Sequence, residues 1–151
     1  MEEQPDLKGE MVVVESRRYP RIPLRMKLKY RILIRGEKSR FEVSHSLADD
    51  LGAKGLAMSS QSPLQGGQLL TLTLFLPPES KRRELVDASV FKEDECNLVS
   101  ILARVAWSKP RGEGRYAVGV EFLDLEPSSR KLLKQFLVDF ELDDMNSPLY
   151  T

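Results

Sequence analysis

The sequence contains few of the side chains on which catalytic and metal sites depend. Among 151 residues there is one cysteine, Cys96, and one histidine, His45. A single cysteine excludes a disulfide within the chain and fits a reducing compartment. Zinc sites need several cysteine or histidine ligands at short spacing, and covalent catalysis needs a nucleophile with a base beside it. We therefore expect a cytoplasmic protein that is not an enzyme and that holds no metal or cofactor.

Long apolar runs and a net charge are also missing. No segment approaches the roughly 20 apolar residues that cross a bilayer, and residues 1–6 are acidic, unlike the basic start of a signal peptide. The 23 basic and 23 acidic residues leave a net charge of zero, whereas proteins that coat nucleic acid usually carry a basic excess. The composition thus argues against membrane insertion and against a nucleic-acid polymer as partner.

The basic residues are nevertheless concentrated in one part of the chain. Residues 16–36 contain eight basic residues and no acidic one. The C-terminal end, in contrast, carries Asp139, Glu141, Asp143 and Asp144. A local basic patch on a protein without net charge suits a small anionic ligand or an acidic partner surface.

Alternation of apolar and polar residues predicts six β-strands. In the clearest case, every second residue from Met26 to Ile34 is apolar, and most of the residues between them are basic. A period of two with one wet face is typical of a half-buried strand. Similar runs cover residues 41–47, 56–59, 70–76, 99–107 and 116–122. Turns are expected at residues 36–39 and 109–114, whereas residues 79–97 fit no single element.

The hydrophobic period changes near the C-terminus. After Pro127, a residue favoured at the first helical position, apolar residues follow helical spacing: Leu132, Leu133, Phe136, Leu137 and Phe140. Short strands closed by one amphipathic helix predict a mainly β protein, a small antiparallel six-stranded barrel with a C-terminal α-helix. We expect an N-terminal arm over residues 1–15, the barrel domain over 16–141, and an acidic tail over 142–151.

We expect the single histidine and the single tryptophan to have structural roles. His45 falls on the apolar phase of its strand, so we expect it in the core or at its rim rather than as a base or a ligand. Trp107 closes the run 99–107. We expect its ring to pack at the end of the barrel rather than to stack on a base.

Two short motifs suggest a ligand site. Just before the first strand lie Arg17, Arg18 and Arg21. Guanidinium groups offer forked donors and a flat face, which suit phosphate groups and purine edges. At a turn between two later strands lie Asp50, Gly52 and Gly55. A carboxylate accepts hydrogen bonds from guanine N–H groups, and glycine lets a backbone pass close to a ligand, so the two motifs together predict a site for a guanine-bearing, doubly charged nucleotide.

Each motif alone has an ordinary structural interpretation. Basic residues beside a strand discourage edge-to-edge aggregation, and aspartate and glycine occur in turns of every kind. The order and spacing of the two motifs carry a resemblance, however. Arg17-x-x-x-Arg21 followed by Asp50-x-Gly52-x-x-Gly55 resembles the PilZ domain, the bacterial receptor module for cyclic di-GMP, whose signatures are RxxxR and [D/N]xSxxG. The family's serine is replaced by Gly52 here.

The resemblance extends over roughly residues 15–140, because Tyr116–Leu125 is similar to the last strand of a PilZ barrel. It implies that the arginines hold phosphate and the Hoogsteen edges of guanine. Asp50 would accept from the Watson–Crick edge, and Gly52 and Gly55 would leave room for the base. Arg18 would stack on the ligand or bind a second phosphate.

The function expected from this resemblance is that of a cyclic di-GMP receptor or adaptor. Only about fifteen residues precede the arginines, and nothing resembles an effector domain. We therefore expect a monomer or homodimer that changes conformation on binding the second messenger and signals through an unidentified effector protein. Motility, exopolysaccharide and virulence control are the outputs that the family suggests.

Two other interpretations stay open at this point. A PilZ-like adaptor that no longer binds nucleotide would act by protein–protein contacts, and the missing serine is its best argument. A small barrel that binds RNA or single-stranded DNA could use the basic face from Arg25 to Arg31. That face lacks the interleaved exposed aromatic residues on which bases stack, since Tyr30 belongs to the apolar set.

Overall fold

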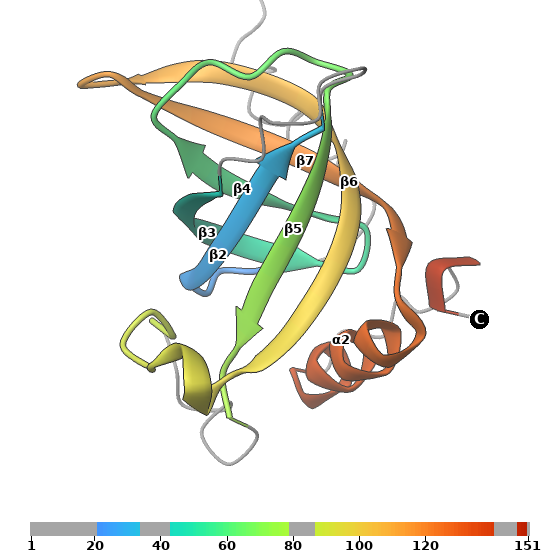
Figure 1. Cartoon of the computed structure of the whole chain (residues 1–151). Coiled ribbons are helices and arrows are strands. Elements are labelled where there is room, and N and C mark those ends of the chain that lie inside the picture. Colours follow the sequence, from blue (N-terminus) through green and yellow to red (C-terminus); the bar gives the residue numbers. More distant parts are fainter. Residues whose placement is uncertain (1–20, 34–42, 79–86, 141–147, 151) are drawn as a thin grey trace, which may run out of the picture.

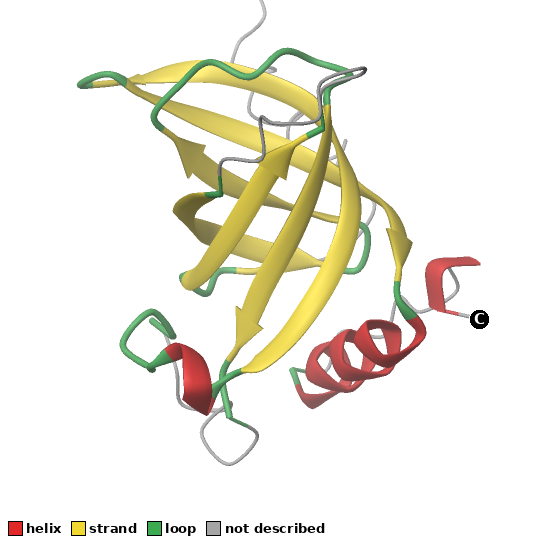
Figure 2. Ribbon diagram, in the orientation of Figure 1, coloured by secondary structure: helices red, strands yellow, loops and turns green. Residues whose placement is uncertain are grey.

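The strands predicted from alternation form a closed antiparallel barrel (Figures 1 and 2). A computed structural model describes residues 21–33, 43–78, 87–140 and 148–150. Within these ranges the strands are β1 (Arg21–Ile22), β2 (Met26–Ile32), β3 (Ser44–Gly52), β4 (Gly55–Ser60), β5 (Leu69–Leu76), β6 (Asn97–Gly112) and β7 (Arg115–Leu125). The helices are the 3-10 turn η2 (Glu93–Glu95), the α-helix α2 (Pro127–Asp139) and the 3-10 turn η3 (Pro148–Tyr150).

The barrel closes because β3 pairs on both of its edges. In the described residues the order β3-β2-β5-β6-β7-β4 returns to β3 through the β3–β4 pairing. The short strand β1 lies beside the end of β3, where Arg21 is opposite Gly52 and Ile22 is opposite Leu51. The prediction of a six-stranded antiparallel barrel with a C-terminal helix is confirmed, and β1 is one extra strand.

Alternate residues of the long strands fill the barrel. The buried residues on the inward face are Met26, Leu28 and Tyr30 of β2 and Leu70, Leu72, Leu74 and Leu76 of β5. On β6, the strand next to β5, the inward residues are Val99, Ile101, Ala103 and Val105. Burial of these side chains supplies the main stabilisation, roughly 1.5–3 kcal/mol for each large one.

The strand phase predicted for residues 41–47 is wrong. Ser44, Ser46 and Ala48 are opposite buried residues of β2 and share their inward face, whereas His45 is exposed. The hydrophobic pattern gave the wrong phase because the inward residues of this strand are small or polar. Residues 34–42, including the expected start of this strand, lie outside the described residues.

Two predicted turns are shorter in the structure than in the sequence pattern. The expected turn from Asp50 to Gly55 consists of Ala53 and Lys54 alone, because β3 continues through Gly52 and β4 begins at Gly55. Likewise, β6 continues to Gly112 and turns at Glu113 and Gly114. Figure 1 shows the resulting β6–β7 hairpin extending beyond the rest of the barrel. All three residues of the second motif therefore lie on strands, and the sheet defines the direction of the Asp50 side chain.

The helix predicted from Pro127 is confirmed. It buries Leu133, Phe136 and Leu137 against the barrel, and the Ser129 hydroxyl accepts a hydrogen bond from the Ser100 N–H at 2.7 Å. The turn Pro148–Tyr150, which the sequence pattern assigns to an acidic tail, is also packed on the barrel. Within the described ranges, no helix has the length and apolar character needed to cross a bilayer.

Candidate functional site

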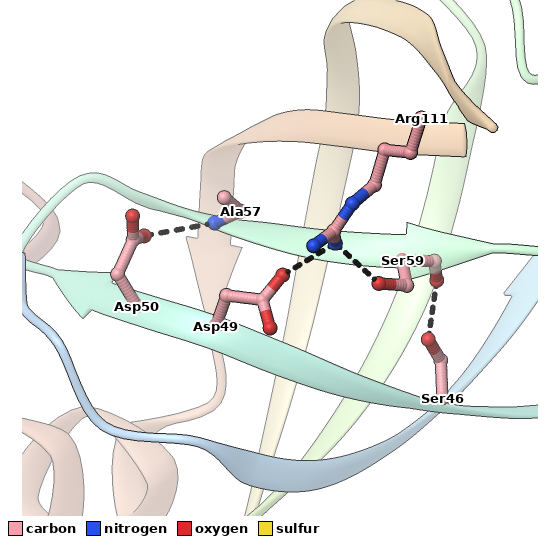
Figure 3. Close-up of polar contacts among 6 residues, drawn as sticks. All are labelled: Ser46, Asp49, Asp50, Ala57, Ser59 and Arg111. Carbon is pink, nitrogen blue, oxygen red and sulfur yellow. Dashed lines mark hydrogen bonds and ion pairs between the residues drawn. The ribbon is translucent and has the colours of Figure 1, made fainter. Parts of the chain in front are cut away.

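The structure joins one arginine of the first motif to the aspartate of the second. Arg21 Nη1 lies 3.1 Å from Asp50 Oδ1. The same oxygen accepts a hydrogen bond from the Ala57 N–H at 3.0 Å (Figure 3). Their side chains are 25% and 17% exposed. Both contacts from described residues use Oδ1, so neither of them occupies Oδ2 of Asp50.

A β-bulge sets the direction of the Asp50 side chain. Along β3, Ala48 is opposite Met58, but Asp50 is opposite Ala57, so Asp49 is the extra residue. A bulge breaks the strict alternation of faces and re-aims the side chains around it. Here it places both carboxylates on the outer wall, and Arg111 from the β6–β7 hairpin contacts Asp49 Oδ2 at 3.1 Å and Ser59 Oγ at 2.8 Å (Figure 3).

The register of four strands extends the site sideways from Asp50. Asp50 on β3 is opposite Ala57 on β4, Ala57 is opposite Gly119 on β7, and Gly119 is opposite Trp107 on β6. We call this line the outer row. The Trp107 ring lies over Gly119, where an added Cβ would be 2.3 Å from the indole, and Trp107 is 43% exposed. The row thus crosses the outer wall of the barrel from an aspartate at one end to an aromatic ring at the other.

Trp107 was predicted to pack at the barrel end, and this prediction is wrong. A bulge between Val105 and Trp107 moves the ring from the inward phase to the outer wall, where Lys109 Nζ lies 5.4 Å from its centre. The sequence does contain a signal for this position of the Trp107 ring. A glycine in the interior of a strand, here Gly119, indicates that another group approaches its backbone closely.

The two glycines of the second motif have different surroundings. Gly52 is the last residue of β3, and its backbone pairs with Arg21 of β1. Gly55 begins β4, and an added Cβ there would be 2.3 Å from the Val120 carbonyl oxygen of β7. The absence of a side chain at Gly55 is therefore required for strand packing, independently of any ligand.

The structure thus brings together Arg21, Asp50 and Gly52, and it places Gly55 one strand away. Arg17 and Arg18 lie outside the described residues. Neither His45 nor Cys96 belongs to this cluster, and no group of three metal-binding side chains occurs in the part of the chain that the structure describes. The side chains described at this site offer a guanidinium group, a carboxylate and, along the outer row, an indole ring.

These features define a small antiparallel β-barrel domain whose candidate ligand site lies on the outer wall. The family model for the PilZ domain matches residues 15–139. The chain therefore belongs to the PilZ domain family, as its two motifs indicated. No curated protein matches the chain.

Solved structures agree with this assignment at the level of fold. The inhibitor of motility MotI/DgrA from Bacillus subtilis is 16% identical, with a TM-score of 0.57 over 83% of this chain and 50% of that chain. The PilZ domain of YcgR from Escherichia coli, solved with c-di-GMP, is 13% identical, with a TM-score of 0.53 over 83% of this chain and 91% of that chain. This chain corresponds to about half the length of the Bacillus protein. At such identities the likeness shows the shared barrel.

Proposed function

We propose that this PilZ domain protein is a cyclic di-GMP receptor that binds the nucleotide on its outer wall. The observation that carries the proposal is the contact between Arg21 and Asp50, which are 29 residues apart. Folding brings Arg21 of the first motif to Asp50 of the second, and the outer row begins at Asp50. The E. coli structure of the same fold contains this ligand, which supports the choice of nucleotide.

The chemistry of the described side chains suits a dianionic guanine dinucleotide. The Arg21 guanidinium can exchange its single contact with Asp50 for a forked contact with a phosphate. The ion pair with Asp50 is partly buried, at 25% and 17% exposure of its two side chains, and the charge-assisted contact with the phosphate would replace the contact that is lost. Asp50 then accepts from the guanine N1–H and N2–H groups, and the flat face of Trp107 offers a stacking surface.

The further parts of this role are also proposals. The protein acts in the cytoplasm without catalysis, as a monomer or homodimer. Nucleotide binding shifts its conformation, and the changed surface is recognised by an effector protein. The competing function is that of an adaptor that has lost nucleotide binding, and Gly52 in place of the family's serine is the observation that favours it.

Isothermal titration with cyclic di-GMP tests the receptor function directly. We expect saturable heat with cyclic di-GMP and none with cyclic di-AMP. Adenine lacks the N1–H and N2–H groups from which Asp50 would accept hydrogen bonds. Amide chemical-shift changes should centre on residues 50–57 and 119. A folded sample that shows neither heat nor shifts with millimolar cyclic di-GMP would leave the adaptor function.

Restoring the family's serine should strengthen binding. Gly52 has the backbone of a strand, and the described glycines with positive φ are Gly67, Gly112 and Gly114, so serine is compatible with the backbone at residue 52. One added hydrogen bond contributes about 0.5–1.5 kcal/mol, so Gly52→Ser should tighten binding by up to about tenfold. Titration of both proteins measures this difference. Weaker binding by the variant would show that the site has adapted to glycine.

Removing the Trp107 indole should weaken the binding of cyclic di-GMP. Stacking of a base on an aromatic ring contributes about 1–3 kcal/mol, and we expect Trp107→Ala to lose about 1–2 kcal/mol of affinity. Leu98→Ala is the matched control, because Leu98 is a similarly exposed apolar residue at the far end of the same strand. Quenching of Trp107 fluorescence by the nucleotide gives a second measurement. Equal affinity of both variants would remove Trp107 from the site.

A further inference from the structure

The turn between β3 and β4 is held by residues from the far end of the chain. It consists of Ala53 and Lys54 and joins the two halves of the second motif. The Lys54 carbonyl accepts a hydrogen bond from the Phe122 N–H of β7 at 2.8 Å. The Ala53 carbonyl accepts one from the Tyr150 hydroxyl at 2.6 Å, across 97 residues of sequence.

Tyr150 is built into the barrel rather than resting on its surface. It ends the turn η3, is 5% exposed, and belongs to the main hydrophobic core. Figure 1 places η3 beside α2 and the end of β7, and both contacts are present in the structure. Burial raises the pKa of the Tyr150 hydroxyl above its ordinary value, so the group stays protonated and remains a donor at neutral pH.

The acceptor of this hydrogen bond lies next to the ligand-binding backbone. Ala53 directly follows Gly52, whose backbone pairs with Arg21, and Asp50 is three residues away. A rotated peptide at Ala53 would shift the end of β3 and with it the contact between Arg21 and Asp50. Without the hydroxyl, the Ala53 carbonyl would lose a partner in a buried place, which favours such a rotation.

We propose that Tyr150 is a positioning residue of the nucleotide site and that Pro148–Tyr150 is a C-terminal latch on the motif turn. The proposal rests on the receptor function proposed above and adds a second element to it. Coupling between two binding events is reciprocal. A latch that strengthens nucleotide binding is therefore itself strengthened when the nucleotide binds, and the C-terminal segment responds to occupancy of the site.

The chain offers a matched pair of variants for the test. Tyr150→Phe removes the hydroxyl and keeps the ring. Tyr30→Phe does the same to a tyrosine that is also 5% exposed, whose hydroxyl bonds to Ser60 Oγ at 3.1 Å away from the motif turn. Thermal unfolding of both variants first establishes that they are folded. Each is then measured by titration with cyclic di-GMP and by amide hydrogen exchange in the ligand-free state.

We expect Tyr150→Phe to weaken cyclic di-GMP binding by about three- to tenfold and to speed exchange of the amides at residues 53–55, with Tyr30→Phe like the wild type in both. Addition of cyclic di-GMP to the wild type should slow exchange at residues 149 and 150. Equal affinity and equal exchange for the two variants would overturn the latch. If the wild type itself does not bind cyclic di-GMP, the receptor function fails, while exchange at residues 53–55 still decides whether Tyr150 holds the turn.

Discussion

Replacing Arg21 with alanine is expected to weaken cyclic di-GMP binding by about 2–5 kcal/mol, which is roughly 30-fold or more. The change removes the forked donor for a phosphate. It also removes the cation beside Asp50, which accepts the Arg21 contact at 3.1 Å in the free protein. The unpaired carboxylate then repels the dianion, so the loss exceeds that of one neutral hydrogen bond. Isothermal titration of both proteins at fixed salt measures the effect.

Two further variants separate charge from geometry at this position. Arg21→Lys keeps the charge but loses the planar fork, and its affinity should lie between those of the wild type and the alanine variant. Lys131→Ala removes one positive charge from the exposed side of α2, so it controls for the change in net charge. Unchanged affinity in Arg21→Ala would take Arg21 out of the site and would leave the binding of phosphate to Arg17 and Arg18.

Replacing Gly55 with alanine should destabilise the fold by about 3 kcal/mol. The new Cβ would lie 2.3 Å from the Val120 carbonyl oxygen, and a backbone atom in a paired strand cannot move aside as a side-chain end can. Overpacking of this kind typically costs about 1–3 kcal/mol, and a backbone clash belongs at the upper end. Denaturant-induced unfolding measures the difference in the free energy of unfolding.

Gly66→Ala is the control for the loss of backbone freedom at a glycine. Its added Cβ would meet the Ala106 carbonyl oxygen at 3.7 Å, an ordinary contact distance. We expect its stability to stay close to that of the wild type, because a compatible glycine-to-alanine change alters stability by only about 0.4–1 kcal/mol. If Gly55→Ala were as stable as Gly66→Ala, strand packing would not explain the glycine, and a role toward the ligand would remain its best explanation.

These two experiments divide the second motif by function. Asp50 contacts the Arg21 side chain and Gly52 pairs with the Arg21 backbone, whereas Gly55 serves the β4–β7 pairing. A protein that had lost nucleotide binding would still need Gly55 to close its barrel, but it would have no use for the approach of Arg21 to Asp50. The sensitivity of binding to Arg21, measured against the sensitivity of folding to Gly55, therefore tests the receptor function against the adaptor function.

The local pattern of the sequence was sufficient for most of the fold. Alternation located β2, β5 and the inner part of β6, because each has one apolar face that must be buried. The helical spacing after Pro127 located α2 for the same reason. The two motifs identified the family, since they are short segments whose residue types and spacing are read directly from the chain.

The tertiary structure alone decided which residues share the outer wall. Bulges at Asp49 and before Trp107 change the phase of their strands, and hydrophobic alternation does not indicate where a ladder gains an extra residue. The outer row from Asp50 to Trp107 depends on the register of four strands, which only their pairing defines. The contact of Tyr150 with Ala53 leaves no local signal at all, because a hydrogen bond across 97 residues exists only after the barrel has closed.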